Sequence, residues 1–124
     1  CVVEGALTEE IAARLSKAVI TSTMVKAAVF GSDANWGRIL CAIGCEGAEF
    51  DPNKIDIIFE SKKGYVEVCK DGTPLQFSEK KARSILEDDE ITIIVDLQMG
   101  DKMANAWGCD LTYEYVRING SYRS

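Results

Sequence analysis

Apolar residues recur along the chain with the spacing of three amphipathic helices. After Thr8, which is suited to cap a helix, apolar residues follow at i, i+4, i+7 and i+8. These residues are Ile11, Leu15, Ala18 and Val19. A second helix is predicted after Asp33 or Asn35, either of which can cap it, and a third after Ser78. The pattern therefore predicts three helices, each with one face turned to a core.

Short apolar runs and strict alternation predict the strands. Residues 25–30 form an apolar run that ends at Gly31, and residues 91–97 form a run rich in β-branched side chains. We expect both runs to be buried strands, the second at the centre of a sheet. The Asp71-Gly72 pair is a strong hairpin signal. Further strands are expected at the amino terminus and at residues 55–59, 65–70 and 74–76.

The last stretch of the chain, residues 104–124, carries a pronounced pattern. Leu111, Tyr113 and Tyr115 alternate with polar residues, which predicts a strand with one buried face that continues to Ile118. A polar tail with amide, hydroxyl and guanidinium groups follows. Two interpretations of this tail stay open: it merely ends a strand, or it is held against another surface.

The order of these elements mixes hairpins with helices. This mixture favours an α+β fold with a mixed sheet of about five or six strands and three helices. At 124 residues, the chain is expected to form a single α+β domain over residues 1–124.

Charge and hydropathy exclude some classes of partner. The formal net charge of −6 argues against nucleic acid or an anionic membrane as the partner. No apolar run approaches the roughly 20 residues needed to span a bilayer. We therefore expect no nucleic-acid and no membrane partner.

Five cysteines and no histidine limit the metal and disulfide chemistry of the chain. An odd number does not suit a fully paired secreted framework. Cys41 and Cys45 lie four residues apart and could share a helix face, but no C-x-x-C motif or other cluster of soft ligands accompanies them. We expect reduced thiols in a cytoplasmic protein, no metal site and no cofactor.

Three further features each have a functional and a structural interpretation. Cys1 could be the nucleophile of a self-processed hydrolase, or the end of a fragment. Residues 31–38 could form a substrate loop at a helix amino terminus, or a capped turn that packs Trp36. The acidic residues 87–90 could bind a cation, or form a solvated loop. The structural interpretation is favoured in each case. Because a triad cannot be assembled without histidine, no catalytic residue is predicted in this chain.

Two long motifs resemble one enzyme family. The sequence AWGCDLTYEYVRINGSYRS, residues 106–124, is similar to the carboxyl terminus of the bifunctional ornithine acetyltransferase/N-acetylglutamate synthase family of arginine biosynthesis. The sequence VKAAVFGSDANWGRILCAIG, residues 25–44, resembles the same family at the expected distance upstream. The resemblance spans essentially the whole chain, but only the later part of the family's β chain.

The resemblance implies an activity and a set of partners. Family members are cleaved autocatalytically into α and β chains, and the threonine that then begins the β chain carries an acetyl group from N-acetylornithine to glutamate. Some members also use acetyl-CoA as donor. The threonine, the oxyanion-hole residues and a substrate-binding lysine would lie upstream of Cys1, with a substrate-binding glutamate just ahead of it. We therefore expect this chain to act with the α chain and the amino-terminal part of the β chain, in a hetero-oligomer.

Within this chain, the resemblance assigns substrate binding to Asn119 and Ser124. An amide offers two donors and an acceptor, and a hydroxyl offers both roles, so the two groups can orient an amino-acid backbone. Ser124 stands where many family members have threonine, which keeps the hydroxyl and loses a methyl group. The alternative function is a non-catalytic α+β module for binding or assembly.

Overall fold

The helices of the computed structural model, which describes residues 1–123, begin where side chains cap them. The predicted caps are confirmed: Thr8, Asn35 and Ser78 each accept a hydrogen bond from the backbone N–H three residues further on, at 3.1, 3.1 and 3.2 Å. Ser22 and Thr112 cap two more helices in the same way. The helices are α1 (Glu9–Thr21), α2 (Thr23–Phe30), α3 (Trp36–Cys45), α4 (Glu79–Leu86) and α5 (Tyr113–Gly120), with a 3-10 turn, η1, at Pro52–Lys54.

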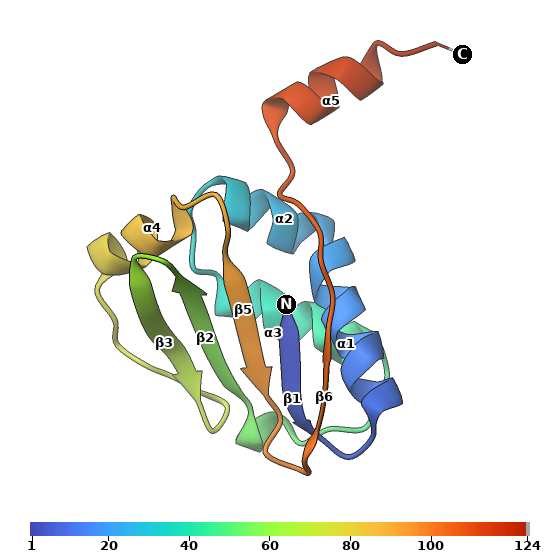
Figure 1. Ribbon diagram of the computed structural model, residues 1–124, viewed down its shortest axis with the longest axis vertical. Coiled ribbons are helices and arrows are strands. Elements are labelled where there is room, and N and C mark those ends of the chain that lie inside the picture. Colours follow the sequence, from blue (N-terminus) through green and yellow to red (C-terminus); the bar gives the residue numbers. More distant parts are fainter. Residues whose placement is uncertain (124) are drawn as a thin grey trace.

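Six strands form one mixed sheet, in the order β4-β3-β2-β5-β1-β6 (Figure 1). They are β1 (Val2–Ala6), β2 (Asp56–Ser61), β3 (Gly64–Lys70), β4 (Thr73–Pro74), β5 (Thr92–Asp96) and β6 (Lys102–Asn105). The pair β1 and β5 is parallel and the other pairs are antiparallel. The α+β class and the strand number are confirmed. The expectation for residues 91–97 is confirmed as well, since β5 lies between β2 and β1.

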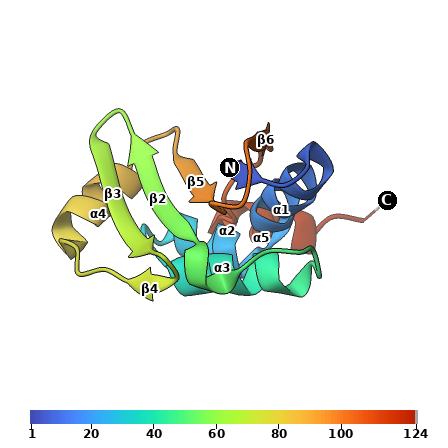
Figure 2. The same ribbon diagram turned by 90° about the horizontal axis from the view of Figure 1, so that it is seen from below.

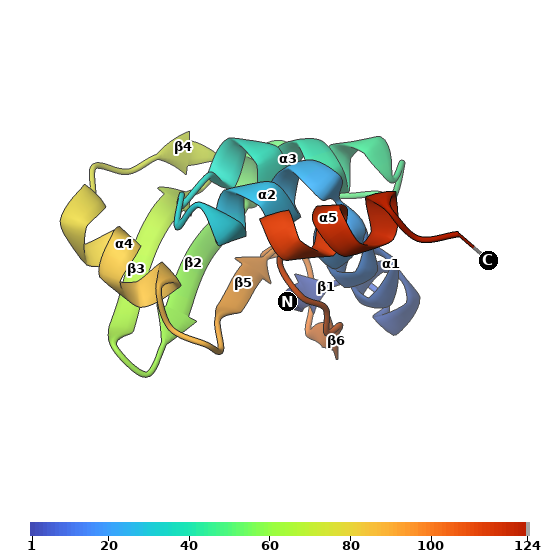
Figure 3. The ribbon, with the colours of Figure 1, turned by 90° about the horizontal axis from the view of Figure 1, so that it is seen from above.

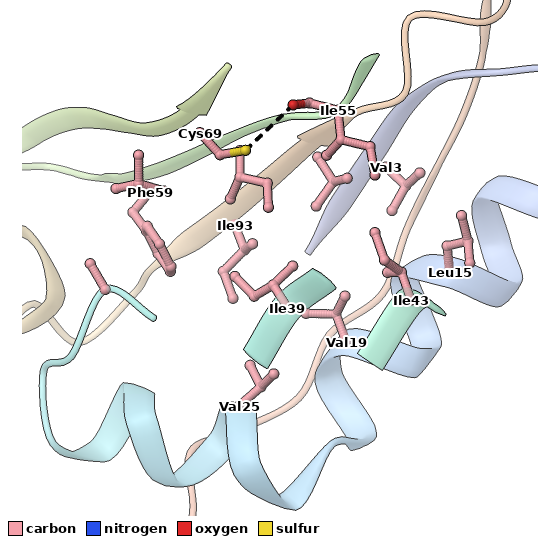
Figure 4. Packing of buried hydrophobic residues seen from close by; sticks show 14 of the residues in the cluster. Val3, Leu15, Val19, Val25, Ile39, Ile43, Ile55, Phe59, Cys69 and Ile93 are labelled. Atoms are coloured by element: carbon pink, nitrogen blue, oxygen red, sulfur yellow. Dashed lines mark hydrogen bonds between the residues drawn. The ribbon is translucent and has the colours of Figure 1, made fainter. Parts of the chain in front are cut away.

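One face of the sheet carries the core. Alternate strand residues such as Val3, Ile57 and Val95 are fully buried, and they pack with Leu15 of α1 and Ile39 of α3 (Figure 4). Burying each such aliphatic side chain stabilises the fold by about 1.5–3 kcal/mol. The helices therefore lie together on this side of the sheet (Figure 2).

The opposite face of the sheet bears a short apolar row. The strand registers place Val2 beside Ile94 and Ile94 beside Ile58, and all three residues are half-buried. Within residues 1–123 no helix covers this face (Figure 2). An antiparallel sheet tolerates one wet face, whereas parallel strands are usually covered on both.

The predicted strand at residues 25–30 is wrong, because these residues belong to helix α2. Ser22 Oγ accepts the N–H of Val25 at 3.2 Å, and this cap starts a helix directly after α1. Val25 and Ala28, three residues apart, are the buried positions. A short continuous apolar run does not distinguish a buried strand from a buried helix, so the pattern alone was ambiguous.

The predicted strand at residues 111–118 is also wrong. Strand β6 ends at Asn105, and Thr112 then caps α5 by accepting the N–H of Tyr115 at 2.9 Å. The alternation that predicted a strand lies partly in the extended segment before the cap. The chain therefore has five helices, and the prediction of three was too low. None of the helices in the described part of the chain is long and apolar enough to cross a membrane.

Two glycines give a matched test of the backbone. Gly72 has a φ of +72°, and a Cβ there would collide with the carbonyl oxygen of Pro52. Gly44 lies in α3, and a Cβ there would meet nothing within 4 Å. We expect Gly72→Ala to lower the free energy of unfolding by about 2–4 kcal/mol. Gly44→Ala should raise it by up to about 1 kcal/mol. Urea denaturation measures both, and equal effects would contradict the assigned backbone conformations.

Candidate functional site

The carboxyl-terminal segment leaves the sheet and crosses the helical layer. After β6, Gly108 lies so close to α1 that a Cβ would be 3.2 Å from the Cβ of Ile20. The backbone N–H of Leu111 then donates to the carbonyl oxygen of Lys26 in α2 at 3.2 Å. A larger residue at Gly108 would have to displace Ile20 by a few tenths of an ångström, so the segment is packed tightly against α1 before α5 begins.

Helix α5 is attached at its base and stands out from the rest of the fold (Figures 1 and 3). The ring of Tyr113 packs edge-on against that of Phe30, with the ring centres 5.1 Å apart. None of the residues of α5 is buried. Beyond this anchor, the helix has little contact with its own domain.

One side of α5 combines apolar and amide groups. Tyr115, Ile118 and Asn119, at positions i, i+3 and i+4, share this side, which we call the arm face. The side chains of Tyr115 and Ile118 are 56% and 55% exposed. The amide nitrogen of Asn119 donates to the carbonyl oxygen of Tyr115 at 2.9 Å. The apolar side chains of the arm face are therefore open to solvent in this part of the chain.

An ion pair occupies the flank of the same helix. Arg117 donates to the carboxylate of Glu114, with a shortest distance of 2.7 Å. This hydrogen bond lowers the pKa of Glu114 and raises the pKa of Arg117. Because both side chains are exposed to solvent, the ion pair contributes little to the stability of the protein.

A cavity of about 580 Å³ lies at the base of α5. Its walls come from four separate parts of the chain: the residue before β1, α1 with α2 and the residues after it, the stretch from the end of α4 into β5, and the segment after β6. The apolar lining includes Val25, Val29, Phe30, Ile91 and Ile93, and the acidic lining consists of Glu87, Asp88, Asp89 and Asp110. Sequence reasoning missed this cavity, because no single motif contains its walls.

A comparison with protein-family models matches residues 1–124 to the ArgJ family. The chain belongs to the ArgJ family. It is 57% identical to the arginine biosynthesis bifunctional protein ArgJ 1 of Clostridium acetobutylicum, over 97% of this chain and 29% of that protein. It is 52% identical to the glutamate N-acetyltransferase of Methanocaldococcus jannaschii, over 98% of this chain and 31% of that protein.

A solved ArgJ structure has the same fold. The crystal structure of the arginine biosynthesis bifunctional protein argJ from Bacillus halodurans matches with a TM-score of 0.90 and 43% sequence identity. The match covers 98% of this chain and 55% of that chain. The chain thus spans about 30% of the length of the curated ArgJ relatives given above, and is similar to them over nearly all of its own length.

Of the two substrate-binding residues expected from the ArgJ resemblance, the structure describes Asn119, which is not among the residues that line the cavity. Asn119 lies on the exposed arm face, and Ser124 lies outside the described residues. Their assignment therefore stays a prediction. What the structure adds is the neighbourhood of Asn119, which shares its face with Tyr115 and Ile118.

The loop at residues 31–38 has the geometry of a capped turn. The Asn35 side chain caps α3 through its oxygen and donates through its nitrogen to the carboxylate of Asp33 at 3.1 Å. Arg38 donates to the carbonyl oxygen of Met24 at 3.0 Å, and Trp36 packs against the core. These groups bind one another, which agrees with the structural interpretation of the loop.

The amino terminus takes part in the sheet. The α-ammonium group of Cys1 donates to the carbonyl oxygen of Ala106 at 2.8 Å. Partial burial lowers the pKa of this amino group. A nucleophile activated by its own amine needs that amine as a base, and here it is a hydrogen-bond donor in the ladder. The geometry gives no support to the hydrolase interpretation of Cys1.

The cysteines differ in environment. Cys41, Cys45 and Cys109 are exposed, Cys1 is half-buried and Cys69 is buried, and all five are free thiols. Burial raises the pKa of the Cys69 thiol, and the charges of Asp56 and Asp71 raise it further. In the described part of the chain, no three carboxylates or thiols are grouped so that they could hold a metal ion.

This difference predicts an order of thiol reactivity. Because the thiolate is the reacting form, Cys41, Cys45 and Cys109 should react with a disulfide reagent rapidly in the native protein. Cys69 should react only on unfolding, and five thiols should titrate in denaturant. Elemental analysis of the same sample should find no stoichiometric metal. One tightly held zinc ion, or a rapidly reacting Cys69, would contradict the prediction.

Proposed function

We propose that this chain is the carboxyl-terminal β-chain domain of an enzyme that transfers an acetyl group from N-acetylornithine to glutamate. The observation that carries the proposal is the family match over residues 1–124. High-identity relatives are named for arginine biosynthesis and for glutamate N-acetyltransferase activity, which supports the same reaction here.

The proposed chemistry is a two-step exchange through an acetyl-threonine. The threonine hydroxyl, upstream of Cys1, attacks the acetyl carbonyl of N-acetylornithine, the C–N bond breaks and ornithine leaves with the proton. The amine of glutamate then attacks the acetyl ester, which forms N-acetylglutamate and regenerates the hydroxyl. The absence of histidine from this chain is consistent with a nucleophile and base that lie elsewhere in the enzyme.

This chain contributes substrate contacts from its carboxyl end. We infer that the arm face packs against the rest of the complete enzyme, which consists of the α chain and the amino-terminal part of the β chain. We place this enzyme in the cytoplasm. Burial of Tyr115 and Ile118 in that contact would bring Asn119 to the substrate. Ser124 is proposed to bind the substrate as well. The exposed apolar side chains of α5 support this placement, because they have little to pack against in their own domain.

The isolated chain should be catalytically silent, because it lacks the nucleophile. The test is incubation with N-acetylornithine and glutamate, followed by an assay for ornithine. Turnover above a blank that is abolished by Cys1→Ala would favour an amino-terminal-cysteine hydrolase. A full-length enzyme that is equally silent would favour the alternative of a non-catalytic binding or assembly module.

In the full-length enzyme, Asn119→Ala and deletion of residues 121–124 should each impair acetyl transfer. Loss of a hydrogen bond to a charged substrate group costs about 1.5–3 kcal/mol. This corresponds to roughly ten- to a hundred-fold in kcat/KM. The melting temperature should stay close to that of the wild type, because none of the described residues 119–123 belongs to the buried core.

A matched control for this prediction is Asn53→Ala. Asn53 is an exposed amide in η1, which precedes β2 and does not line the cavity at the base of α5. The kcat/KM of the Asn53→Ala enzyme should equal that of the wild type. Wild-type kinetics in the truncated enzyme would show that the tail is passive. A large drop in melting temperature without a separate kinetic defect would make its role structural.

A further inference from the structure

Helix α2 provides a packed base for the segment that leads into α5. The Ser22 cap determines where α2 begins, and Val25 and Ala28 bury one side of the helix against the rest of the fold. Phe30 is the last residue of α2 and its side chain is 38% exposed. The ring of Phe30 therefore lies at the surface, on a backbone that is held by its own buried neighbours.

Two contacts with α2 set the direction in which α5 leaves the domain (Figure 3). The backbone N–H of Leu111 donates to the carbonyl oxygen of Lys26 at 3.2 Å. The ring of Tyr113 then packs against that of Phe30, with 84° between the ring planes. Lys26 and Phe30 are four residues apart, about one turn along α2. A single contact would let α5 rotate about it, whereas two contacts one turn apart define a direction.

The ring contact is the one of the two that α5 itself makes. Leu111 precedes the helix, whereas Tyr113 is its first residue. Tyr113 is 82% exposed, so it meets the domain only through one edge of contact. Ring pairs of this edge-to-face kind prefer a defined geometry, with centres roughly 4.5–7 Å apart. The 5.1 Å between the centres of Phe30 and Tyr113 lies within that range.

A small change of angle at Tyr113 becomes a large displacement at Asn119. Asn119 follows Tyr113 by six residues in the same helix, which is about 9 Å along its axis. A tilt of about 10° at Tyr113 would therefore move Asn119 by about 1.6 Å. A misplacement of about 1 Å can cost roughly a hundred-fold in rate, even when the substituted residue lies far from the chemistry.

We propose that Phe30 and Tyr113 are positioning residues for acetyl transfer, because their ring contact sets the direction of α5 and so places the amide of Asn119 at the substrate. The inference rests on the proposed function, which assigns substrate contact to Asn119. Neither ring has to touch the substrate in this role. The angle between α2 and α5 then becomes a requirement of the reaction.

The test is steady-state kinetics of the full-length enzyme with Phe30→Leu and with Tyr113→Leu. Each change removes one ring and keeps an apolar side chain. Each should lower kcat/KM by about ten-fold, since α5 loses the contact that orients it. The melting temperature should stay close to that of the wild type, because neither residue belongs to the buried core. Tyr113→Phe keeps the ring contact and should retain wild-type kcat/KM.

Double variants decide whether the two rings act together and through Asn119. Phe30→Leu combined with Tyr113→Leu should be no more impaired than either single variant, because both changes remove the same contact. In an Asn119→Ala background, Phe30→Leu should cost clearly less than it does in the wild type, because the amide that it misplaces is absent. Losses in kcat/KM that multiply in both double variants would overturn the proposal.

Met24→Leu is the matched control for Phe30→Leu. Met24 is also a large, exposed apolar residue of α2, but it lies near the opposite end of the helix. Its replacement should leave kcat/KM unchanged, and a loss equal to that of Phe30→Leu would overturn the proposal. Wild-type kinetics in both ring variants beside an impaired Asn119→Ala enzyme would overturn the inference and leave the proposed function intact. Wild-type kinetics in Asn119→Ala itself would instead refute the substrate contact on which both rest.

Discussion

The parallel pairing of β1 with β5 is the constraint on which the rest of this fold depends. It sets Val2 beside Ile94 and joins segments about ninety residues apart in sequence. Strand β2 can then pair with the far side of β5, and β6 with the far side of β1. The helices between β1 and β2 must cover the face formed by Val3, Ile57 and Val95. The first strand, the cavity and the base of α5 meet at one end of the sheet as a result.

Local hydrogen bonds explain which parts of the fold could be predicted from sequence. Thr8, Asn35 and Ser78 act on N–H groups three residues away, so their effect can be recognised in a short window. The strand prediction for residues 25–30 was wrong because an apolar run of this length suits a strand and a buried helix equally well. The Ser22 cap and packing against distant elements favour the helix, and neither can be recognised from the apolar run alone.

The candidate site was harder to predict for a different reason. Asn119 was assigned by family resemblance, since an exposed asparagine near a chain end has no pattern of its own. The cavity has walls from four segments, which the pairings of β1 with β5 and with β6 and the packing of α1 and α2 bring together. The terminal strand was wrongly expected because alternation over a few residues is also produced by an extended segment that runs into a helix cap, here at Thr112. Motifs describe neighbours in sequence, whereas this site depends on neighbours in space.

The residues that hold α5 in place, Thr112 and Tyr113, differ from Asn119, to which the proposed function assigns substrate binding. Eight residues are too few for a helix to be stable in water by itself, and none of these eight is buried. The cap at Thr112 and the Tyr113–Phe30 contact define where the helix starts, but they do not cover its surface. Tyr115 and Ile118 supply the apolar area for a contact, and Asn119 lies on the same side. A surface that buries the two apolar side chains must therefore receive the amide as well, so that under the proposed function docking of α5 and substrate contact by Asn119 would occur together.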